Sequence, residues 1–152
     1  MWDKPLGGWR HVSALQHRTK GDYARMMKQI AEEYYPDCEK IILVSDNINT
    51  HSKAAFYEVF SPVTAYWLSQ KFDMHYTPKH GSWLNIAETE LSSLSIQCLG
   101  NRRINTVDEL NFTIANWETL RNRRQIGVNW QFTADDARIK LKRLYQKPLF
   151  QE

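Results

Sequence analysis

The sequence predicts an α/β fold within a single domain, and three observations support this prediction. A continuous apolar run, Ile41–Val44, is typical of a strand that is buried on both faces. Elsewhere, hydrophobic residues recur at helical spacing, and short polar sequences that cap helix N-termini precede these segments. The chain has 152 residues, of which 42% are hydrophobic and 24% charged, so it is long enough to bury one core.

The first third of the chain predicts a hairpin, a helix and a strand. A Gly-Gly pair between two β-compatible runs predicts the hairpin within residues 1–15. Thr19 and Asp22 are spaced as a capping box at the start of the helix, and Pro36 is expected to end it. The buried strand then occupies residues 41–45.

The middle of the chain predicts two helices and a second strand. Residues 52–70 have a helical pattern that is interrupted once. Ser61 suits the N-cap of a new helix there, with Pro62 in its first turn. Residues 72–76 are expected to form the second strand, which Pro78 stops.

Three further helices complete the predicted order. The first follows Gly81, and its apolar seam consists of Leu84, Ala87, Leu91, Leu94 and Cys98. Thr106 and Glu109 have the capping-box spacing for the next helix. Thr133 and Asp136 have the same spacing ahead of the last helix.

Composition narrows the classes of function. The two cysteines, Cys38 and Cys98, are too few for a disulfide framework or a zinc site and are expected to be reduced. No stretch approaches the ~18 apolar residues of a membrane span, and no signal peptide is visible, so a cytoplasmic protein without membrane contact is expected. The net charge of +3 permits nucleic-acid binding without requiring it.

Two acidic residues lie in unusual sequence contexts. Asp46 directly follows the buried strand, where a carboxylate is costly unless something binds it and where ligands collect in open α/β sheets. Glu88 opens an amphipathic helix after a segment that contains proline and glycine. Together they predict a metal-dependent phosphoryl-transfer site. A helix N-cap near Ser52, or an Asx turn, remains an alternative role for Asp46.

These two contexts carry a resemblance to a known family. The runs Asp46-Asn47-Ile48-Asn49-Thr50-His51 and Thr77-Pro78-Lys79-His80-Gly81-Ser82-Trp83-Leu84-Asn85-Ile86-Ala87-Glu88 resemble the second and third acidic motifs of DDE transposases of the bacterial insertion-sequence/mariner superfamily. The resemblance continues through Arg102-Arg103-Ile104, Trp117, Arg121-Asn122 and Trp130-Gln131-Phe132-Thr133, and ends in residues 136–145. It implies the ribonuclease H-like fold shared with retroviral integrases, a three-layer α/β fold with a mixed central sheet, here with extra C-terminal helices.

The resemblance also implies an activity. The family cleaves DNA and transfers strands during transposition, with Mg²⁺ or Mn²⁺ held by acidic residues, here Asp46 and Glu88. Their carboxylates are then expected within roughly 8 Å of each other. Glu90 lies on the other side of the same apolar seam at about the same angle, so helical periodicity alone leaves both glutamates open. The family's Leu-Asn-x-x-Glu pattern selects Glu88.

Seven residues are candidate DNA contacts. They are His51, Lys79, His80, Arg102, Arg103, Arg138 and Lys142. For His51 two other roles stay open, because it could instead orient Asp46 or simply be a hydrogen-bonded loop histidine. The basic residues could equally be solvated surface charges.

One part of the family's pattern is missing. The first catalytic Asp of the family lies on the opening strand of the fold, whereas Met1 falls within what resembles the second strand and Asp3 aligns with the hairpin. The chain is therefore expected to be an N-terminally incomplete catalytic domain over residues 1–152, lacking its first strand.

The missing strand has two consequences for partners and activity. The edge of residues 41–44 would be unpaired, which favours a homodimer or a complementing transposase chain, with residues 1–15 as the expected strand donor. The alternative function is a catalytically inactive remnant that acts as a DNA-binding or oligomerisation module.

Overall fold

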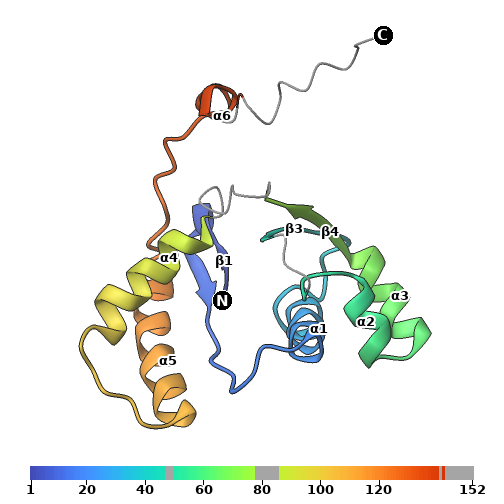
Figure 1. The fold of residues 1–152 in the computed structure, drawn as a ribbon, viewed down its shortest axis with the longest axis horizontal. Helices are drawn as coiled ribbons and strands as arrows, with labels where there is room; N and C mark the ends of the chain where they lie inside the picture. Colours follow the sequence, from blue (N-terminus) through green and yellow to red (C-terminus); the bar gives the residue numbers. More distant parts are fainter. Residues whose placement is uncertain (47–49, 78–85, 141, 143–152) are drawn as a thin grey trace.

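The computed structural model describes residues 1–46, 50–77, 86–140 and 142 (Figure 1). The predicted hairpin is present. Strands β1 (Trp2–Lys4) and β2 (Trp9–His11) pair in antiparallel register, and a 3-10 turn, η1 (Pro5–Gly7), joins them. The next residue, Gly8, has φ +65°, and a Cβ there would lie 2.4 Å from backbone atoms of Gln125. Both the backbone conformation and this close approach require glycine.

The first helix also begins and ends where the sequence predicts. In α1 (Lys20–Gln29), the Thr19 hydroxyl accepts a hydrogen bond from the Asp22 N–H at 3.1 Å. The Asp22 carboxylate accepts one from the Thr19 N–H at 3.0 Å, which completes the capping box. The helix continues as a π-helical turn, η2 (Ile30–Tyr34), and Pro36 follows its end.

The two predicted central strands pair with each other in parallel. β3 (Ile41–Ser45) and β4 (Phe72–Tyr76) form one two-stranded sheet. Helices α2 (Ala54–Val59) and α3 (Pro62–Lys71) connect them, because two parallel strands need a long crossover connection. The side chain of Ser61 caps α3, so the interruption that the sequence predicts is a new helix start.

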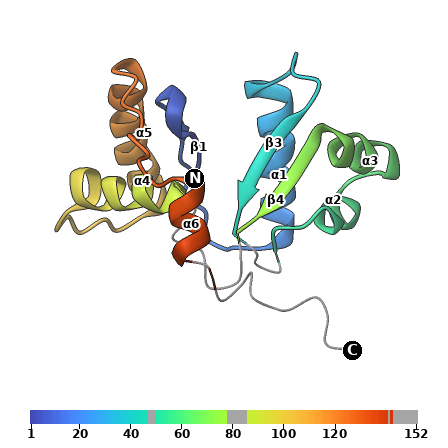
Figure 2. The same cartoon turned by 90° about the horizontal axis from the view of Figure 1, so that it is seen from above.

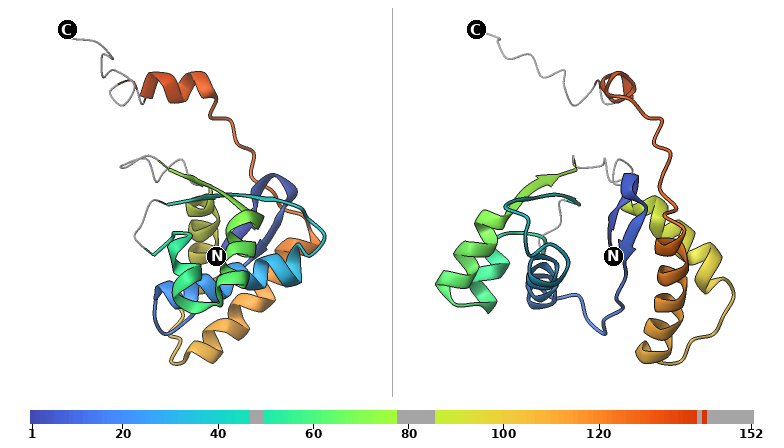
Figure 3. Two further views of the ribbon diagram at one scale, coloured as in Figure 1. Left: turned by 90° about the vertical axis from the view of Figure 1, so that its right-hand side faces the viewer. Right: turned by 180° about the vertical axis from the view of Figure 1, so that it is seen from behind.

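The prediction that β3 is buried on both faces is wrong. Ile42 and Val44 are 72% and 55% exposed, whereas Ile41 and Leu43 pack against the core. Successive side chains of a strand point to opposite faces of a sheet. The helices α1, α2 and α3 cover one face of the β3–β4 pair, and no described helix packs over the other (Figure 3).

The C-terminal half is helical, as predicted. Its elements are α4 (Ala87–Leu94), a π-helical turn η4 (Ser95–Leu99), α5 (Val107–Arg123) and α6 (Ala134–Lys140). The side chains of Thr106 and Thr133 accept hydrogen bonds at the starts of α5 and α6, which confirms both predicted caps.

A second core forms where α4 and η4 pack against α5. Leu94 and Cys98 of the predicted seam are buried there with Ile114 and Trp117. Leu91 of the same seam is 47% exposed and lies outside this core. Cys38 and Cys98 are both free thiols, in agreement with the prediction.

The arrangement is a mixed α/β fold, consistent with the ribonuclease H-like class. The hairpin lies between the α4–α5 pair on one side and α1 on the other (Figures 1 and 2). The sheet is divided into two parts, because among the described strands β1 pairs only with β2 and β3 only with β4. α6 stands apart from both cores at the end of an extended segment (Figure 1). No described helix has the length and apolar character needed to cross a membrane.

Candidate active site

Asp46 lies at the carboxyl end of β3. The pairing of the strands extends one residue past the sheet, since the Thr77 N–H donates to the Ser45 carbonyl at 3.0 Å. The Asp46 side chain is half-buried. The N-cap residue of α2 is Lys53, with no side-chain cap, so the alternative role of Asp46 as the cap of that helix is excluded.

His51 lies beside Asp46, a position that is required both for a DNA contact at this site and for orienting Asp46. An N–H of its ring donates to the main-chain carbonyl of Asp46, and the ring is stacked on Tyr23 with centroids 4.8 Å apart. Burial lowers the pKa of His51, and the hydrogen bond to Asp46 and the Asp46 charge oppose that shift. The ring nitrogen Nδ1 is buried without a partner. The imidazole is therefore fixed at the strand end that bears the carboxylate.

The two glutamates on α4 have different environments. Glu88 is exposed in the first turn, where a carboxylate interacts favourably with the helix dipole. Glu90 is 1% exposed. Its carboxylate accepts hydrogen bonds from Arg121 Nη2 at 3.0 and 3.2 Å and forms an ion pair with Arg10 Nε at 3.0 Å. Two guanidinium groups thus form ion pairs with the Glu90 carboxylate. Glu88 is the α4 carboxylate that remains accessible from solvent.

The arginine partners of Glu90 were not identified from the sequence as structural residues. Arg10 is fully buried in the hairpin and donates to the carbonyls of Gly8 and Ile126 as well as contacting Glu90. Arg121 projects from α5 and also donates to Gln97 at 3.0 Å. The available signal was the presence of Arg121 in one of the matching motifs, because a buried arginine requires an acidic partner.

The other candidate DNA contacts that the structure describes do not gather at one place. Arg102 and Arg103 are exposed beyond the end of the α4–η4 helix that is opposite to the turn bearing Glu88. Arg138 is exposed on α6 and pairs with Asp135 at 2.7 Å, and Lys142 is exposed just beyond that helix. Of the five candidates that the structure describes, only His51 lies next to Asp46. Lys79 and His80 lie outside the described residues.

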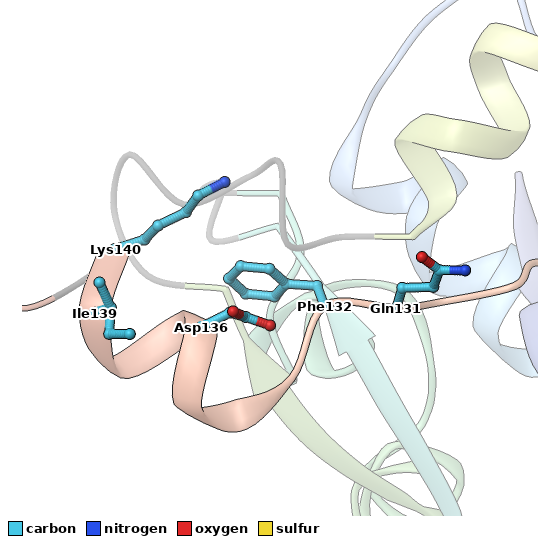
Figure 4. A pocket seen from close by; sticks show the side chains of 5 residues that line it. All are labelled: Gln131, Phe132, Asp136, Ile139 and Lys140. Carbon is cyan, nitrogen blue, oxygen red and sulfur yellow. The ribbon is translucent and has the colours of Figure 1, made fainter.

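A separate hollow lies on α6 and the segment before it. Its volume is about 410 Å³, and it is lined by Gln131, Phe132, Asp136, Ile139 and Lys140 (Figure 4). The ammonium group of Lys140 lies over the Phe132 ring at 5.4 Å. None of the candidate acidic ligands lines this hollow, so it is separate from the Asp46 region.

The donors at the acidic site fit a hard divalent cation in kind but not in full number. Asp46 and Glu88 offer carboxylate oxygens, which Mg²⁺ and Mn²⁺ prefer. The amino-terminal end of α4 lies on the side of the molecule where β3 and β4 end (Figures 1 and 2). Within residues 1–46, 50–77, 86–140 and 142, no group of three His, Cys, Asp or Glu side chains could hold a metal ion. The separation of the two carboxylates stays a prediction.

Comparison with known proteins adds a family to this geometry. No curated protein and no solved structure gave a match to the chain. A family model described as DDE superfamily endonuclease matches residues 4–111, a stretch that includes β2, both central strands and both acidic motifs. The chain belongs to the DDE endonuclease superfamily.

Proposed function

We propose that the chain is part of a transposase catalytic domain of the insertion-sequence/mariner type, which cleaves and joins DNA strands with Mg²⁺ or Mn²⁺. The observation that supports this proposal most is the contrast on α4. Glu90 is occupied by Arg10 and Arg121, whereas Glu88, the glutamate of the matching motif, is exposed. Asp46 provides a second carboxylate at the end of β3.

In this proposal Asp46 and Glu88 are the metal ligands. When bound, divalent ions at such a site activate the attacking oxygen and stabilise the leaving oxygen. The chain's own residues hold and orient the reactants. His51 fixes the main chain at Asp46, and the basic side chains contact the DNA backbone, where each ion pair releases counterions. These contacts are assigned to His51, Lys79, His80, Arg102, Arg103, Arg138 and Lys142.

A third carboxylate is required for two ions. Because the described residues contain no group of three ligands, we assign the third to a complementing transposase chain or to a second copy of this one. The chain alone is then expected to have little or no metal-dependent nicking activity. Robust Mg²⁺-dependent nicking that disappears in Asp46→Asn would show instead that another residue of this chain supplies the third ligand.

Calorimetric titration of Mn²⁺ tests the two assigned ligands. Asp46→Asn and Glu88→Gln are each expected to weaken Mn²⁺ binding by about tenfold or more, since each removes one carboxylate. Asp108→Asn is the matched control, because Asp108 is likewise an exposed acid in the first turn of a helix. Equal affinities for the native chain and all three variants would contradict the assignment.

The same shortage of ligands favours a second candidate function, an inactive DNA-binding or oligomerisation module. Such a module binds DNA in a salt-dependent manner that is indifferent to Mg²⁺. DNA binding that is unchanged in Asp46→Asn and Glu88→Gln, together with no measurable Mn²⁺ binding by the native chain, would favour this second function.

A further inference from the structure

We propose that Tyr23 is a positioning residue for the Asp46 site, and that it acts by holding the His51 imidazole against the main chain of Asp46. This inference rests on the proposed function, because the site it serves is the proposed metal site. It assigns to α1, which bears no candidate ligand, an indirect part in orienting Asp46.

The first step is the rigidity of Tyr23 itself. It lies in the first turns of α1, whose start is fixed by the capping box, and its side chain is 8% exposed. Its ring is nearly parallel to that of Phe56 from α2, with an interplanar angle of 4° and centroids 6.3 Å apart. Phe56 is fully buried in the first core. Tyr23 is therefore held by two helices.

The second step is the contact between Tyr23 and His51. The two rings are stacked at an interplanar angle of 24°, with centroids 4.8 Å apart. His51 lies on the segment between β3 and α2. The stack restricts the imidazole to one plane.

The third step connects the imidazole to the candidate ligand. His51 donates to the main-chain carbonyl of Asp46, the residue at the end of β3. Because Tyr23 fixes the plane of the imidazole, it also fixes this hydrogen bond. The hydrogen bond in turn restrains the main chain at Asp46, which bears the carboxylate side chain. Groups that orient a metal ligand through one intervening hydrogen bond commonly contribute to metal affinity.

The Tyr23 hydroxyl separates this inference from two others. It is buried without a partner among the described residues, which is unfavourable for a hydroxyl. Phenylalanine would give the same stack without that unpaired group. If the ring is what matters, Tyr23→Phe keeps the site intact and Tyr23→Leu impairs it. If the hydroxyl is what matters, the two variants behave alike.

Nuclear magnetic resonance of the metal-free chain gives the first test. Tyr23→Leu should shift the Asp46 amide and His51 ring resonances, and Tyr23→Phe should restore the native positions. Phe56→Leu is the matched control, because it removes the aromatic ring that stacks on Tyr23 and leaves the Tyr23–His51 stack in place. Equal shifts from Phe56→Leu and Tyr23→Leu would overturn the inference, since the effect would then be one of core packing.

Mn²⁺ titration of folded variants gives the second test. Tyr23→Leu should weaken binding by about tenfold, the usual effect of losing a residue that orients a ligand. The same change in a His51→Gln background should cause no further loss, because Tyr23 acts through His51. Additive losses, or equal losses in Tyr23→Leu and Tyr23→Phe, would overturn the inference. If Asp46→Asn leaves Mn²⁺ affinity unchanged, the proposed function fails, and the resonance shifts still decide the role of Tyr23.

Discussion

The Arg121 guanidinium reaches both carboxylate oxygens of Glu90, with Nη2 at 3.0 Å from Oε1 and 3.2 Å from Oε2. Arg10 Nε completes the cluster at 3.0 Å from Oε2, and the Arg10 and Glu90 side chains are at most 1% exposed. The three side chains come from the hairpin, α4 and α5. This cluster joins the three elements, and it separates the structural glutamate of α4 from the one that remains available for chemistry.

Removal of the Glu90 charge is expected to destabilise the fold strongly. Glu90→Gln leaves two buried guanidinium groups without their paired carboxylate, and breaking such a buried pair typically costs about 3–5 kcal/mol. Glu88→Gln, two residues earlier and exposed, should change the free energy of unfolding by less than about 0.5 kcal/mol. Urea unfolding followed by circular dichroism measures both. A neutral Glu90→Gln paired with a destabilising Glu88→Gln would reverse the assignment on α4.

Asn122 is expected to matter for the attachment of the hairpin to α5. Its side-chain carbonyl accepts from the Arg10 N–H at 2.9 Å and its amide donates to the Arg10 carbonyl at 2.8 Å, so it satisfies both backbone groups of one strand residue. Asn122→Ala should cost about 1–3 kcal/mol because it leaves these groups unsatisfied.

Asn116→Ala on the same helix is the control for that substitution. Asn116 is exposed, and its amide donates only to the Phe112 carbonyl within α5. Its replacement should change the unfolding free energy by less than about 0.5 kcal/mol. Equal effects of the two alanine substitutions would show that the Asn122 side chain does not hold the hairpin.

The acid dependence of stability should identify Asp3 as an unfavourable carboxylate. Burial and the Glu90 carboxylate raise the pKa of Asp3 above its ordinary 3.8, against smaller opposing effects of Arg10 and the amino terminus. A raised pKa means that the folded chain binds the Asp3 proton more tightly than the unfolded chain does. Protonation of Asp3 therefore stabilises the fold fully below pH 3.8, and this stabilisation is lost as the pH rises through the raised pKa. The melting temperature of Asp3→Asn relative to the native chain should therefore increase as the pH rises from about 3.8 through the raised pKa, and should level off above it.

The pKa of Asp22 is shifted in the opposite direction, so Asp22→Asn can be compared with Asp3→Asn over the same range of pH. Hydrogen bonds from Thr19 lower the pKa of Asp22, so its contribution is present at neutral pH and is lost as the pH falls. The deficit of Asp22→Asn in melting temperature should shrink on acidification, while the gain of Asp3→Asn also shrinks. A gain of Asp3→Asn that does not depend on pH would show that the Asp3 charge is not the cause.

The helices and strands were largely predictable from local sequence, whereas the pairing of charges was not. The capping box at Thr19, the side-chain cap at Thr106 and the proline at the start of α3 act through neighbouring residues, so the sequence contains them directly. The Glu90 cluster joins residues more than one hundred positions apart at its extremes, Arg10 and Arg121, and no local pattern encodes such a contact. The prediction that β3 is buried on both faces failed because it also depends on distant parts of the chain. A face of a strand is covered only if another element packs over it.

The unpaired edge of β3 is expected to promote self-association. Among the described strands β3 pairs only with β4, and Ile42 and Val44 are exposed beside that open edge. Association through residues 1–15 is less consistent with the structure, because β1 and β2 pair with each other and the hairpin is bound to α5 of its own chain. We therefore assign the contact to β3.

Sedimentation velocity at micromolar concentration tests this assignment. The native chain should sediment as a dimer or larger species, and Val44→Lys should shift it towards the monomer, because a charge at an open edge disfavours pairing. Ile139→Lys is the control, since Ile139 is similarly exposed but lies on α6. A strictly monomeric native chain would contradict the assignment.

The central claim is that Asp46 and Glu88 bind the same metal centre, and a crystal structure of the chain with Mn²⁺ tests it most directly. Anomalous scattering identifies the ion independently of the protein. The account predicts a manganese peak between the two side chains, with oxygen ligands from both at about 2.1 Å or slightly longer. Glu90 should remain paired with Arg10 and Arg121 and should not bind the ion. A peak coordinated by Glu90, or Asp46 and Glu88 on opposite faces of the domain, would contradict it.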